Sequence, residues 1–247
     1  MWPISDLTII VPTYNEKDNV GMLLVQLDKV LTGLNWNVLF VDDNSPDGTA
    51  DHIREFSKRD PRVSCLCRTA NRGLASACIE GMTLATAPFV ALIDADLQHD
   101  EALLPQMYDA LASSELDIII GSRYMDGGGT GELGLCRRWI SRVATRLSRI
   151  FVPKELTDPM SGFFMIRRDT FLKIVPHLYG KGFKILLDIF ASSSEPLAFR
   201  EFSYVFRQRN AGESKLSGTV IWDYLEFIIA RKTARLVPSA FMLFVLV

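Results

Sequence analysis

Two aspartates separated by one residue stand at the end of an apolar run near the middle of the chain. The run, 89–93, is followed by Asp-Ala-Asp-Leu-Gln at 94–98, and such a run predicts a strand buried on both faces. If strand geometry persists, Asp94, Asp96 and Gln98 share one face. Their oxygens are the ligands that a hard cation such as Mg²⁺ or Mn²⁺ prefers. The stretch predicts a metal site that holds a phosphorylated donor, or more simply a polar turn with a helix-capping acid.

Composition limits the class of protein. The 247 residues are 48% hydrophobic and 23% charged, which fits one sizeable α/β domain or two small ones. The net charge of -2 argues against a general nucleic-acid-binding protein. The four cysteines have neither zinc-ligand spacing nor a disulfide framework, so we expect free, buried thiols in a reducing compartment. No basic segment with a following apolar core begins the chain, so no secretory signal is expected.

Strands and helices are predicted to alternate through the first half of the chain. Short apolar runs predict strands at 7–11, 38–41, 63–66, 89–93 and 117–120. Apolar residues at helical spacing predict helices at 18–31, 50–59, 74–86 and 101–113. This alternation is typical of an α/β fold with a mainly parallel sheet and right-handed crossovers. Further along, strands are predicted at 163–166 and 197–206, with a buried helix at 183–192 between them.

Each unusual polar cluster of the first half follows one of these strands. The clusters are 14–16, 42–43, 71–73, 94–98 and 122–123. Because open α/β sheets bind ligands at the carboxyl ends of their strands, we expect these loops to form one site. A dinucleotide-binding Rossmann domain would need Gly-x-Gly-x-x-Gly after the first strand, where this chain has Pro-Thr-Tyr-Asn-Glu. A bound diphosphate would instead be neutralised by a metal and basic side chains, as at a nucleotide-sugar site.

Seven motifs, in order and at plausible spacing, resemble those of the inverting family 2 glycosyltransferases of the GT-A fold. They are Pro-Thr-Tyr-Asn-Glu at 12–16, Val-Asp-Asp-Asn-Ser-Pro-Asp-Gly at 41–48, Asn-Arg-Gly at 71–73, Asp-Ala-Asp-Leu-Gln at 94–98, Gly-Ser-Arg-Tyr at 121–124, Ser-Gly-Phe at 161–163 and Gly-Glu-Ser-Lys-Leu at 212–216. Within that family the chain looks most like the dolichyl-phosphate (polyprenyl-phosphate) mannose synthases, over about residues 7–235. The resemblance implies a Rossmann-like, mainly parallel central sheet flanked by helices.

The resemblance also implies roles for individual side chains. Contacts to the nucleotide base and ribose are implied for Pro12, Tyr14, Glu16, Val41 and Asp43. Asp94 and Ala95 would complete the donor site, and Asp96 and Gln98 would ligate a divalent cation, Mg²⁺ or Mn²⁺. Phosphate groups would be bound by Arg123, Arg209 and Lys215, with Arg137 or Arg138 as a further candidate at the acceptor. Catalysis is expected to depend on Asp96 together with the three phosphate-binding cations.

Two loops of the second half are predicted to lie near the reacting groups. The segment 158–163 precedes a short strand, and the resemblance places it near the reaction centre, although a purely structural turn would have the same composition. The glycines at 127–131 suit a mobile flap near the acceptor, or a solvated linker. Neither reading is favoured by the glycines alone.

Three stretches point to a membrane surface. Residues 137–154 carry six positive side chains and no acid, so an amphipathic helix at about 137–152 is predicted to lie in a membrane interface; an ordinary surface helix is the alternative. A juxtamembrane helix is predicted at 219–238, and the apolar 239–247 as the start of a possible transmembrane segment. The catalytic domain is then 1–218, at the cytoplasmic face of a membrane, with room for a membrane partner or a further membrane domain.

The resemblance implies transfer of mannose from GDP-mannose to dolichyl or polyprenyl monophosphate, with inversion to a β-linked sugar for glycan assembly. A phosphate monoester is largely dianionic at neutral pH, since its second pKa is about 6, so this acceptor needs no strong general base. A polyprenyl-phosphate glucosyl- or aminoarabinosyl-type transferase would use the same machinery. A protein of another class, a non-catalytic nucleotide-sugar-binding or membrane-scaffold module, would keep the fold without the transfer.

Overall fold

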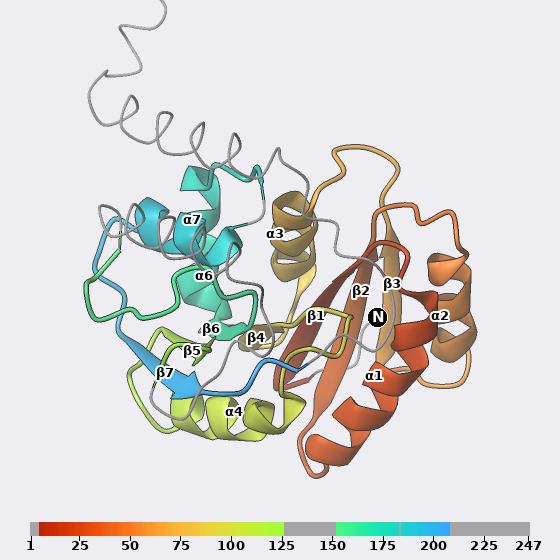
Figure 1. Ribbon diagram of the computed structural model, residues 1–247, viewed down its shortest axis with the longest axis horizontal. Helices are drawn as coiled ribbons and strands as arrows, with labels where there is room; N and C mark the ends of the chain where they lie inside the picture. The colour runs from red at the N-terminus through yellow and green to blue at the C-terminus, as the bar shows by residue number, and fades with distance from the viewer. Residues whose placement is uncertain (1–4, 126–151, 183, 208–247) are drawn as a thin grey trace, which may run out of the picture.

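A seven-stranded, mostly parallel sheet forms the centre of the molecule, as the computed structural model shows for residues 5–125, 152–182 and 184–207 (Figure 1). Its strands are β1 (Leu7–Thr13), β2 (Trp36–Asp42), β3 (Val63–Cys67), β4 (Phe89–Leu92), β5 (Ile118–Ser122), β6 (Phe164–Arg167) and β7 (Phe199–Ser203). Their order across the sheet is β3-β2-β1-β4-β6-β5-β7. Among the described strands, β6 alone runs antiparallel, and it pairs with both β4 and β5.

Helices cover both faces of this sheet. They are α1 (Lys17–Val30), α2 (Thr49–Ser57), α3 (Leu74–Leu84), α4 (Leu104–Ala112), α6 (Arg168–Ile174) and α7 (Ile185–Ser192), with short 3₁₀ turns η1 (Glu101–Leu103) and η2 (Val175–His177). Residues of α1, α2 and α4 pack into one apolar cluster with one set of strand side chains. Residues of α3, α6 and α7 pack into a second cluster on the opposite face. Figure 1 shows α3, α6 and α7 on one side of the sheet and α1 and α4 on the other.

Alternation along each strand divides its side chains between the two clusters. In β1, Leu7, Ile9 and Val11 contribute to the first cluster and Ile10 to the second. Helix α3 approaches the sheet very closely at Gly81, where an added Cβ would lie 2.7 Å from Cγ2 of Ile10. A side chain at position 81 would therefore push this helix away from β1.

The predicted elements are confirmed, with changes at their ends. Strand β1 continues through Pro12, although proline usually ends a central strand. The carbonyl of Ile10 accepts from Ile93 on the β4 side, whereas the carbonyl of Thr13 accepts from Asp43 on the β2 side. The nitrogen of Pro12 therefore faces the β4 side, beyond the last residue of β1 that pairs with β4. The missing N–H of Pro12 costs the sheet no hydrogen bond there.

The thiols are only partly as predicted. Cys78 is buried in α3, but Cys65 and Cys67 on the edge strand β3 are half-buried. Burial raises the pKa of Cys65 to about 11, so its thiol stays protonated at neutral pH.

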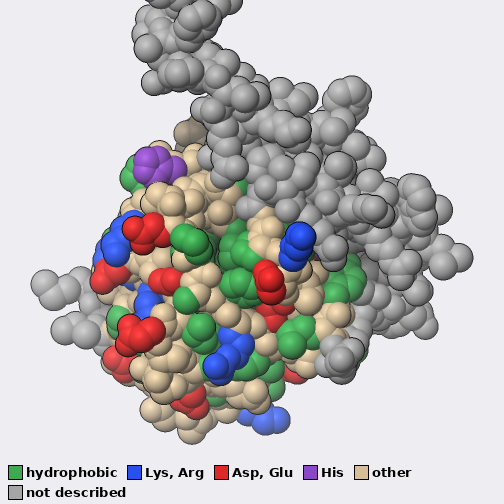
Figure 2. Space-filling view, turned by 90° about the vertical axis from the view of Figure 1, so that its left-hand side faces the viewer, with side chains coloured by type: hydrophobic (Ala, Val, Ile, Leu, Met, Phe, Trp, Pro, Cys, Tyr) green, Lys and Arg blue, Asp and Glu red, His purple; other side chains and the backbone are tan. Residues whose placement is uncertain are grey.

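Within the residues that the structure describes, no helix combines the length and apolar character required to cross a membrane. The surface seen in Figure 2 carries acidic and basic side chains interspersed with apolar ones over the described part of that face.

The predicted site lies at the topological switch point of the sheet, between β1 and β4. From β1 the chain builds outward through β2 and β3, and then returns to add β4 on the other side of β1. The crevice outside the carboxyl ends of two such strands is where open α/β sheets bind ligands. The loops after β1 and β4 both begin at this edge.

Candidate active site

Among the described residues, four other than glycine have a positive φ, and each lies in a loop after one of the first four strands. They are Asn15, Asn44, Asn71 and Leu97, with φ angles between 54° and 61°. Asparagine tolerates this left-handed conformation, but leucine pays about 1–2 kcal/mol for it. The Leu97 side chain is only 3% exposed and belongs to the apolar cluster beneath the loop, which holds the strained backbone in place.

The loop after β4 differs from the strand-like geometry considered for it. Strand β4 ends at Leu92, and residues 95–97 form a turn, so the alternation that would place Asp94, Asp96 and Gln98 on one face does not apply. The turn has its own internal contact, because the Gln98 N–H donates to Oδ1 of Asp96 at 3.2 Å. The direction of these side chains is therefore set by the turn and by the positive φ of Leu97.

The side-chain amide of Gln98 is oriented by a distant part of the chain. Its Nε2 donates to the carbonyl of Arg207 at 3.0 Å, and the Arg207 N–H donates to the carbonyl of Gln98 at 2.8 Å. The amide nitrogen is thereby used, which leaves Oε1 as the atom that can bind a cation. In the described part of the chain no group of three or more His, Cys, Asp or Glu side chains is arranged to hold a metal ion. A cation held by Asp96 and Gln98 would thus need further oxygen ligands, such as diphosphate oxygens and water.

Arg207 fastens the segment after β7 onto this loop. Its guanidinium donates to Asp100 at 2.5 Å and to Glu101 at 2.7 Å. Asp100 also caps the following turn, since its carboxylate accepts from the N–H of Ala102. The simpler prediction of a capping acid is confirmed alongside the contacts that suit a ligand site. Arg207 is the last described residue before the predicted phosphate-binding positions.

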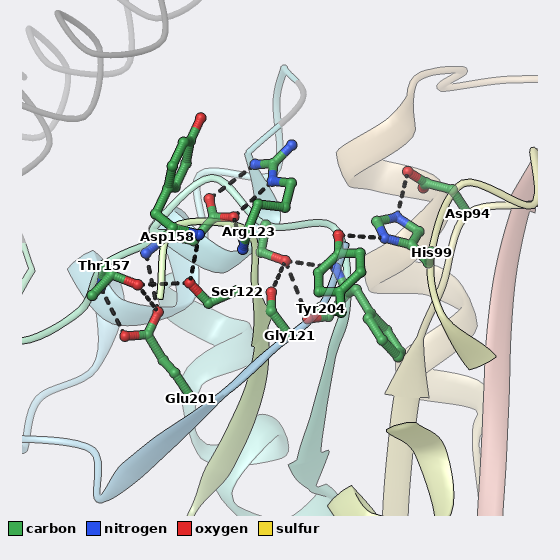
Figure 3. A network of polar contacts seen from close by, with 12 residues as sticks. Asp94, His99, Gly121, Ser122, Arg123, Thr157, Asp158, Glu201 and Tyr204 are labelled. Carbon is green, nitrogen blue, oxygen red and sulfur yellow. Dashed lines mark hydrogen bonds and ion pairs between the residues drawn. The ribbon is translucent and has the colours of Figure 1, made fainter. Parts of the chain in front are cut away.

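Asp94 lies beside a buried histidine (Figure 3). Nε2 of His99 is 3.1 Å from Oδ2 of Asp94, and Nδ1 of His99 is 2.8 Å from the hydroxyl of Tyr204. His99 and Tyr204 are each only 3% exposed, whereas the side chain of Asp94 is 37% exposed. Burial raises the pKa of the Tyr204 phenol, so it remains protonated at neutral pH. The three side chains form a line from the buried Tyr204, which directly follows β7, to an accessible carboxylate.

The Ser-Gly-Phe segment at 161–163 passes close to Asp94, as the resemblance implies. At Gly162 an added Cβ would lie 3.3 Å from Oδ2 of Asp94. The hydroxyl of Ser161 donates to the carbonyl of Gly121 at 2.7 Å, which ties the segment to the end of β5. Gly121 in turn allows the Phe163 ring to approach, since an added Cβ there would be 2.5 Å from that ring. Small residues at 121 and 162 therefore permit the close packing around Asp94.

Arg123 forms a bidentate ion pair with Asp158 (Figure 3). Nε and Nη2 of Arg123 donate to the two carboxylate oxygens at 2.7 and 2.9 Å. Burial lowers the pKa of the guanidinium, but the hydrogen bonds and charge of Asp158 outweigh this and raise it above the ordinary value. The phosphate contact predicted for Arg123 stays a prediction, since the cation is observed on a carboxylate.

A carboxylate from β7 supports this pair. Glu201 accepts from the N–H groups of Thr157 and Asp158 at 2.9 and 3.0 Å. The hydroxyl of Thr157 also donates to Glu201, and it lies 2.6 Å from the hydroxyl of Ser122. The loop that carries Asp158 is therefore held between β5 and β7.

On the nucleotide side, Asp43 is engaged by its own neighbours. Its carboxylate accepts from the N–H of Gly73 at 2.7 Å and lies 2.9 Å from Nε of Arg68. Arg68 is buried and donates through Nη2 to the carbonyl of Asn71 and the hydroxyl of Ser76. Asp43 thus joins the end of β2 to the loop after β3, and its predicted contact with the base or ribose stays a prediction.

The loops after β1 and β2 are joined in the same manner. The N–H groups of Asn15 and Glu16 donate to the hydroxyls of Ser45 and Thr49. Asp42 is fully buried and accepts from both the N–H and the hydroxyl of Ser45, at 2.8 and 2.5 Å. These contacts hold the segment that carries Tyr14 and Glu16.

Tyr14 is exposed to solvent, whereas Glu16 is half-buried. Tyr14 is 37% exposed, and the guanidinium carbon of Arg72 is 5.2 Å from its ring centre. Glu16 immediately precedes α1 as its N-cap residue, and its carboxylate accepts from the side chain of Asn19 at 2.7 Å. An accessible aromatic ring beside a cation suits the base contact predicted for Tyr14.

Three other predicted residues offer little side-chain surface. Pro12 and Val41 are buried and lie opposite each other in the β1–β2 register, and Ala95 is 2% exposed. Val41 packs against α3 at Gly81, where an added Cβ would be 2.8 Å away. Val41 and Ala95 therefore offer a ligand almost no accessible surface, and their predicted contacts with the donor stay predictions.

Several predictions fall on residues outside the described ranges. They are the phosphate contacts of Arg209 and Lys215, the candidates Arg137 and Arg138, the flap at 127–131, nearly all of the amphipathic helix at 137–152, the juxtamembrane helix at 219–238 and the segment at 239–247. The domain boundary at 218 lies outside as well. These stay predictions.

No individual role was predicted for His99, Tyr204, Asp158 or Arg207, although Asp158 begins the segment 158–163 that the resemblance places near the reaction centre. His99 lies one residue beyond the Asp-Ala-Asp-Leu-Gln motif, and its position within a polar run was the available signal. The partners of Asp158 and Tyr204 could not be predicted, because they are 35 and 105 residues away in the sequence.

The sequence itself matches a known family. Residues 8–175 match the description "Glycosyl transferase family 2". That match covers more than half of the 247 residues, and the chain belongs to this glycosyltransferase family.

Curated relatives are similar over most of the chain. A dolichol-phosphate mannosyltransferase of Pyrococcus furiosus is 38% identical over 90% of this chain and 62% of its own length. A protein of the same name from Mycosarcoma maydis is 34% identical over 97% of this chain and 84% of its own. The chain thus spans less than two thirds of the archaeal relative and most of the fungal one.

Solved structures share the fold. Glucosyl-3-phosphoglycerate synthase from Mycobacterium tuberculosis, in complex with UDP, has a TM-score of 0.66 at 17% identity, over 92% of this chain and 80% of that one. The same enzyme with Mn²⁺, UDP-glucose and phosphoglyceric acid also has a TM-score of 0.66, at 15% identity, over 92% and 79%. The predicted GT-A fold is confirmed by this likeness together with the observed sheet.

Proposed function

We propose that this protein transfers mannose from GDP-mannose to dolichyl or polyprenyl monophosphate, with inversion of the anomeric centre. The proposal is supported by the two curated relatives named dolichol-phosphate mannosyltransferase, one of which is similar over 97% of the chain. Because the chain spans 62% of the archaeal relative, the activity of the whole protein is part of the proposal.

The observation that carries the proposal is the turn at 94–98. It lies at the carboxyl end of β4 beside β1, with Gly162 against Asp94 and Arg207 against Gln98. The turn thus places the carboxylate of Asp96, which is 6% exposed, and the amide oxygen of Gln98 at the edge where α/β sheets bind nucleotides. Such a donor set fits a hard divalent cation.

We propose Mg²⁺ or Mn²⁺ as the cofactor, held by Asp96 and by Oε1 of Gln98. When bound, the cation offsets negative charge on the leaving diphosphate. The mycobacterial enzyme of the same fold was solved with Mn²⁺ and UDP-glucose, which supports a cation at this type of site. Asp94 would orient the donor sugar, with Tyr14 and Asp43 on the nucleotide side.

The transfer is a single displacement at the anomeric carbon. An oxygen of the acceptor phosphate forms the new bond as the bond from carbon to the donor diphosphate breaks, and the electron pair leaves with GDP. The acceptor oxygen is already ionised at neutral pH, so no side chain has to remove a proton from it. Arg123, Arg209 and Lys215 are proposed to reduce the repulsion between the two anionic substrates.

The acceptor places the enzyme at a membrane. A long polyprenyl chain stays in the bilayer, so its phosphate must be met at the surface. The basic 137–152, the helix at 219–238 and the apolar 239–247 are proposed to hold the protein at the cytoplasmic face. A membrane partner or a further membrane domain would suit the same arrangement.

A panel of nucleotide sugars tests this function. Purified protein would be incubated with labelled GDP-mannose, UDP-glucose or a UDP-aminoarabinose donor, a short polyprenyl phosphate, and either Mg²⁺, Mn²⁺ or EDTA. We expect label in the lipid extract with GDP-mannose and a divalent cation. Transfer from a UDP-sugar instead would identify a glucosyl- or aminoarabinosyl-type enzyme. Nucleotide-sugar binding without transfer from any donor would identify a non-catalytic module.

A further inference from the structure

We propose that Tyr204 and His99 are positioning residues that hold the Asp94 carboxylate in the orientation in which it contacts the donor sugar. The contacts run from the Tyr204 hydroxyl to Nδ1 of His99 and from Nε2 of His99 to Oδ2 of Asp94. The inference deepens the proposed function, because it takes Asp94 to be part of the donor-sugar site.

The chemistry of the three groups fixes the direction of their hydrogen bonds. An ionised carboxylate only accepts, so the proton on the 3.1 Å contact must belong to Nε2 of His99. In the neutral form of the imidazole, which carries a single proton, Nδ1 then accepts from the hydroxyl of Tyr204 at 2.8 Å. Tyr204 thereby selects the tautomer of His99 that donates to Asp94. Loss of the hydroxyl would leave Nδ1 without this donor.

Aromatic packing fixes the two rings. The His99 ring centre lies 5.3 Å from that of Phe163 and 5.5 Å from that of Phe206. The Tyr204 ring packs edge-on against Phe163 at 5.6 Å. Because both rings are almost fully buried, their hydrogen bonds are protected from competition with water. Rigid, buried partners are what a positioning role requires.

Asp94 is confined on one side and open on the other. Oδ2, the oxygen that contacts His99, is also the nearest atom to the Gly162 Cβ position, at 3.3 Å, while Oδ1 is 3.7 Å away. The carboxylate is thus held through Oδ2, and Oδ1 is the oxygen left to contact a donor. A rotated carboxylate would present the same charge in the wrong direction.

The contact also joins two distant parts of the chain. The N–H of Tyr204 donates to the carbonyl of Ser122, next to Arg123, and the chain continues from Tyr204 to Arg207 on the Gln98 side. His99 and Tyr204 are 105 residues apart in sequence. The end of β7 therefore contributes to donor orientation without itself contacting the donor.

Four variants test the positioning role. Tyr204→Phe removes the hydroxyl and keeps the ring, His99→Gln keeps an N–H donor, and His99→Leu removes it. Tyr108→Phe is the matched control, since Tyr108 packs on Phe89 at the amino end of β4, away from the site. The measurements are kcat and KM for GDP-mannose at saturating acceptor and Mn²⁺, binding of GDP-mannose with Mn²⁺ by calorimetry in the absence of acceptor, and the melting temperature.

We expect Tyr204→Phe to lower kcat about 10-fold, the lower range for loss of a residue that orients a functional group. His99→Leu should lower it more, and His99→Gln should recover part of that loss, a rescue that a purely packing role would not give. Tyr204→Phe should melt within a few degrees of the wild type, and Tyr108→Phe should match the wild type in kcat.

Wild-type kcat in both Tyr204→Phe and His99→Leu would overturn the positioning role. Equal losses in His99→Gln and His99→Leu would also overturn it, because the donated hydrogen bond would then be irrelevant. If the wild type transfers no sugar, the proposed function fails, and calorimetry with GDP-mannose and Mn²⁺ decides the inference separately. In that case unchanged binding in all variants overturns it, and weaker binding in the same order supports it.

Discussion

The candidate site has a nucleotide side and a reaction side, and the two differ in how far apart in the sequence their contacting residues lie. On the nucleotide side, Asp42, Asp43 and Asp47 bind backbone N–H groups of their own and adjacent loops, with partners at most 30 residues away. On the reaction side, His99 and Arg207 reach partners more than 100 residues away. The nucleotide side is thus complete once β1 to β3 are formed. The reaction side also requires Tyr204 and Arg207, from the end of the described chain. Variants on the reaction side are therefore predicted to alter turnover more than nucleotide binding.

Asp96→Ala should give the largest effect on the reaction side. It removes the carboxylate proposed to hold the cation, and we expect kcat to fall about 1,000-fold, or ~4 kcal/mol of transition-state stabilisation. The rate of lipid-linked mannose formation with Mn²⁺ would be measured, with Asp96→Asn as a variant of the same shape. Near-normal metal-dependent transfer in Asp96→Ala would refute the metal assignment.

Asp158→Ala should weaken both folding and transfer. The buried Arg123 would lose its bidentate partner, and an uncompensated buried charge costs about 3 kcal/mol in the free energy of unfolding. Denaturant titration would measure this cost. The double variant Asp158→Ala, Arg123→Met removes the orphaned charge as well, and it should recover part of the stability but not the transfer activity.

Asp42→Asn tests the nucleotide side. The change replaces an acceptor-only group that serves Thr13 and Ser45, and we expect a loss of about 1–2 kcal/mol in stability. The KM for GDP-mannose should rise several-fold while kcat stays within about twofold. A fall in kcat with unchanged KM would contradict the division between the two sides.

Arg207→Gln should have the smallest effect on stability. The pair with Asp100 is exposed, with 43% and 33% of the side chains accessible, and the amide of the substituted glutamine can still donate to the buried Glu101, so the change should cost less than about 1 kcal/mol. The effect on unfolding should shrink further as salt is added. Transfer should nevertheless fall a few-fold, since Arg207 holds its segment beside Gln98. Equal losses of stability for this variant and Asp158→Ala would contradict the contrast drawn from burial.

The difference between local contacts on the nucleotide side and distant contacts on the reaction side explains which parts of the site were predictable from sequence. The loops after β1 to β4 carry chemistry that is local, namely polar residues directly after apolar runs, and the structure brings them to one edge as predicted. Asp158 and Tyr204 depend on which strands become neighbours. That information is absent from periodicity, because β6 enters between β4 and β5 from later in the chain.

The backbone conformation of the loop at 94–98 was a second feature that the sequence did not predict. The motif at 94–98 was predicted correctly as a polar stretch after a strand, but its geometry depends on a left-handed leucine. Leucine rarely adopts that conformation, and here the apolar cluster beneath the loop helps to stabilise it. Propensity alone would not assign this backbone to Leu97.

The antiparallel strand β6 has a consequence for the order in which the molecule can be assembled. Strands β1 to β4 pair with one another within the first 92 residues, whereas β5 meets β4 only through β6, which begins at residue 164. During synthesis, β5 therefore leaves the ribosome with no adjacent strand to pair with on the growing sheet. Contacts this distant in sequence slow folding. A nascent chain would present a nearly finished nucleotide side while the edge of β4 is still open, and that edge is where a chaperone or a mispaired strand would bind.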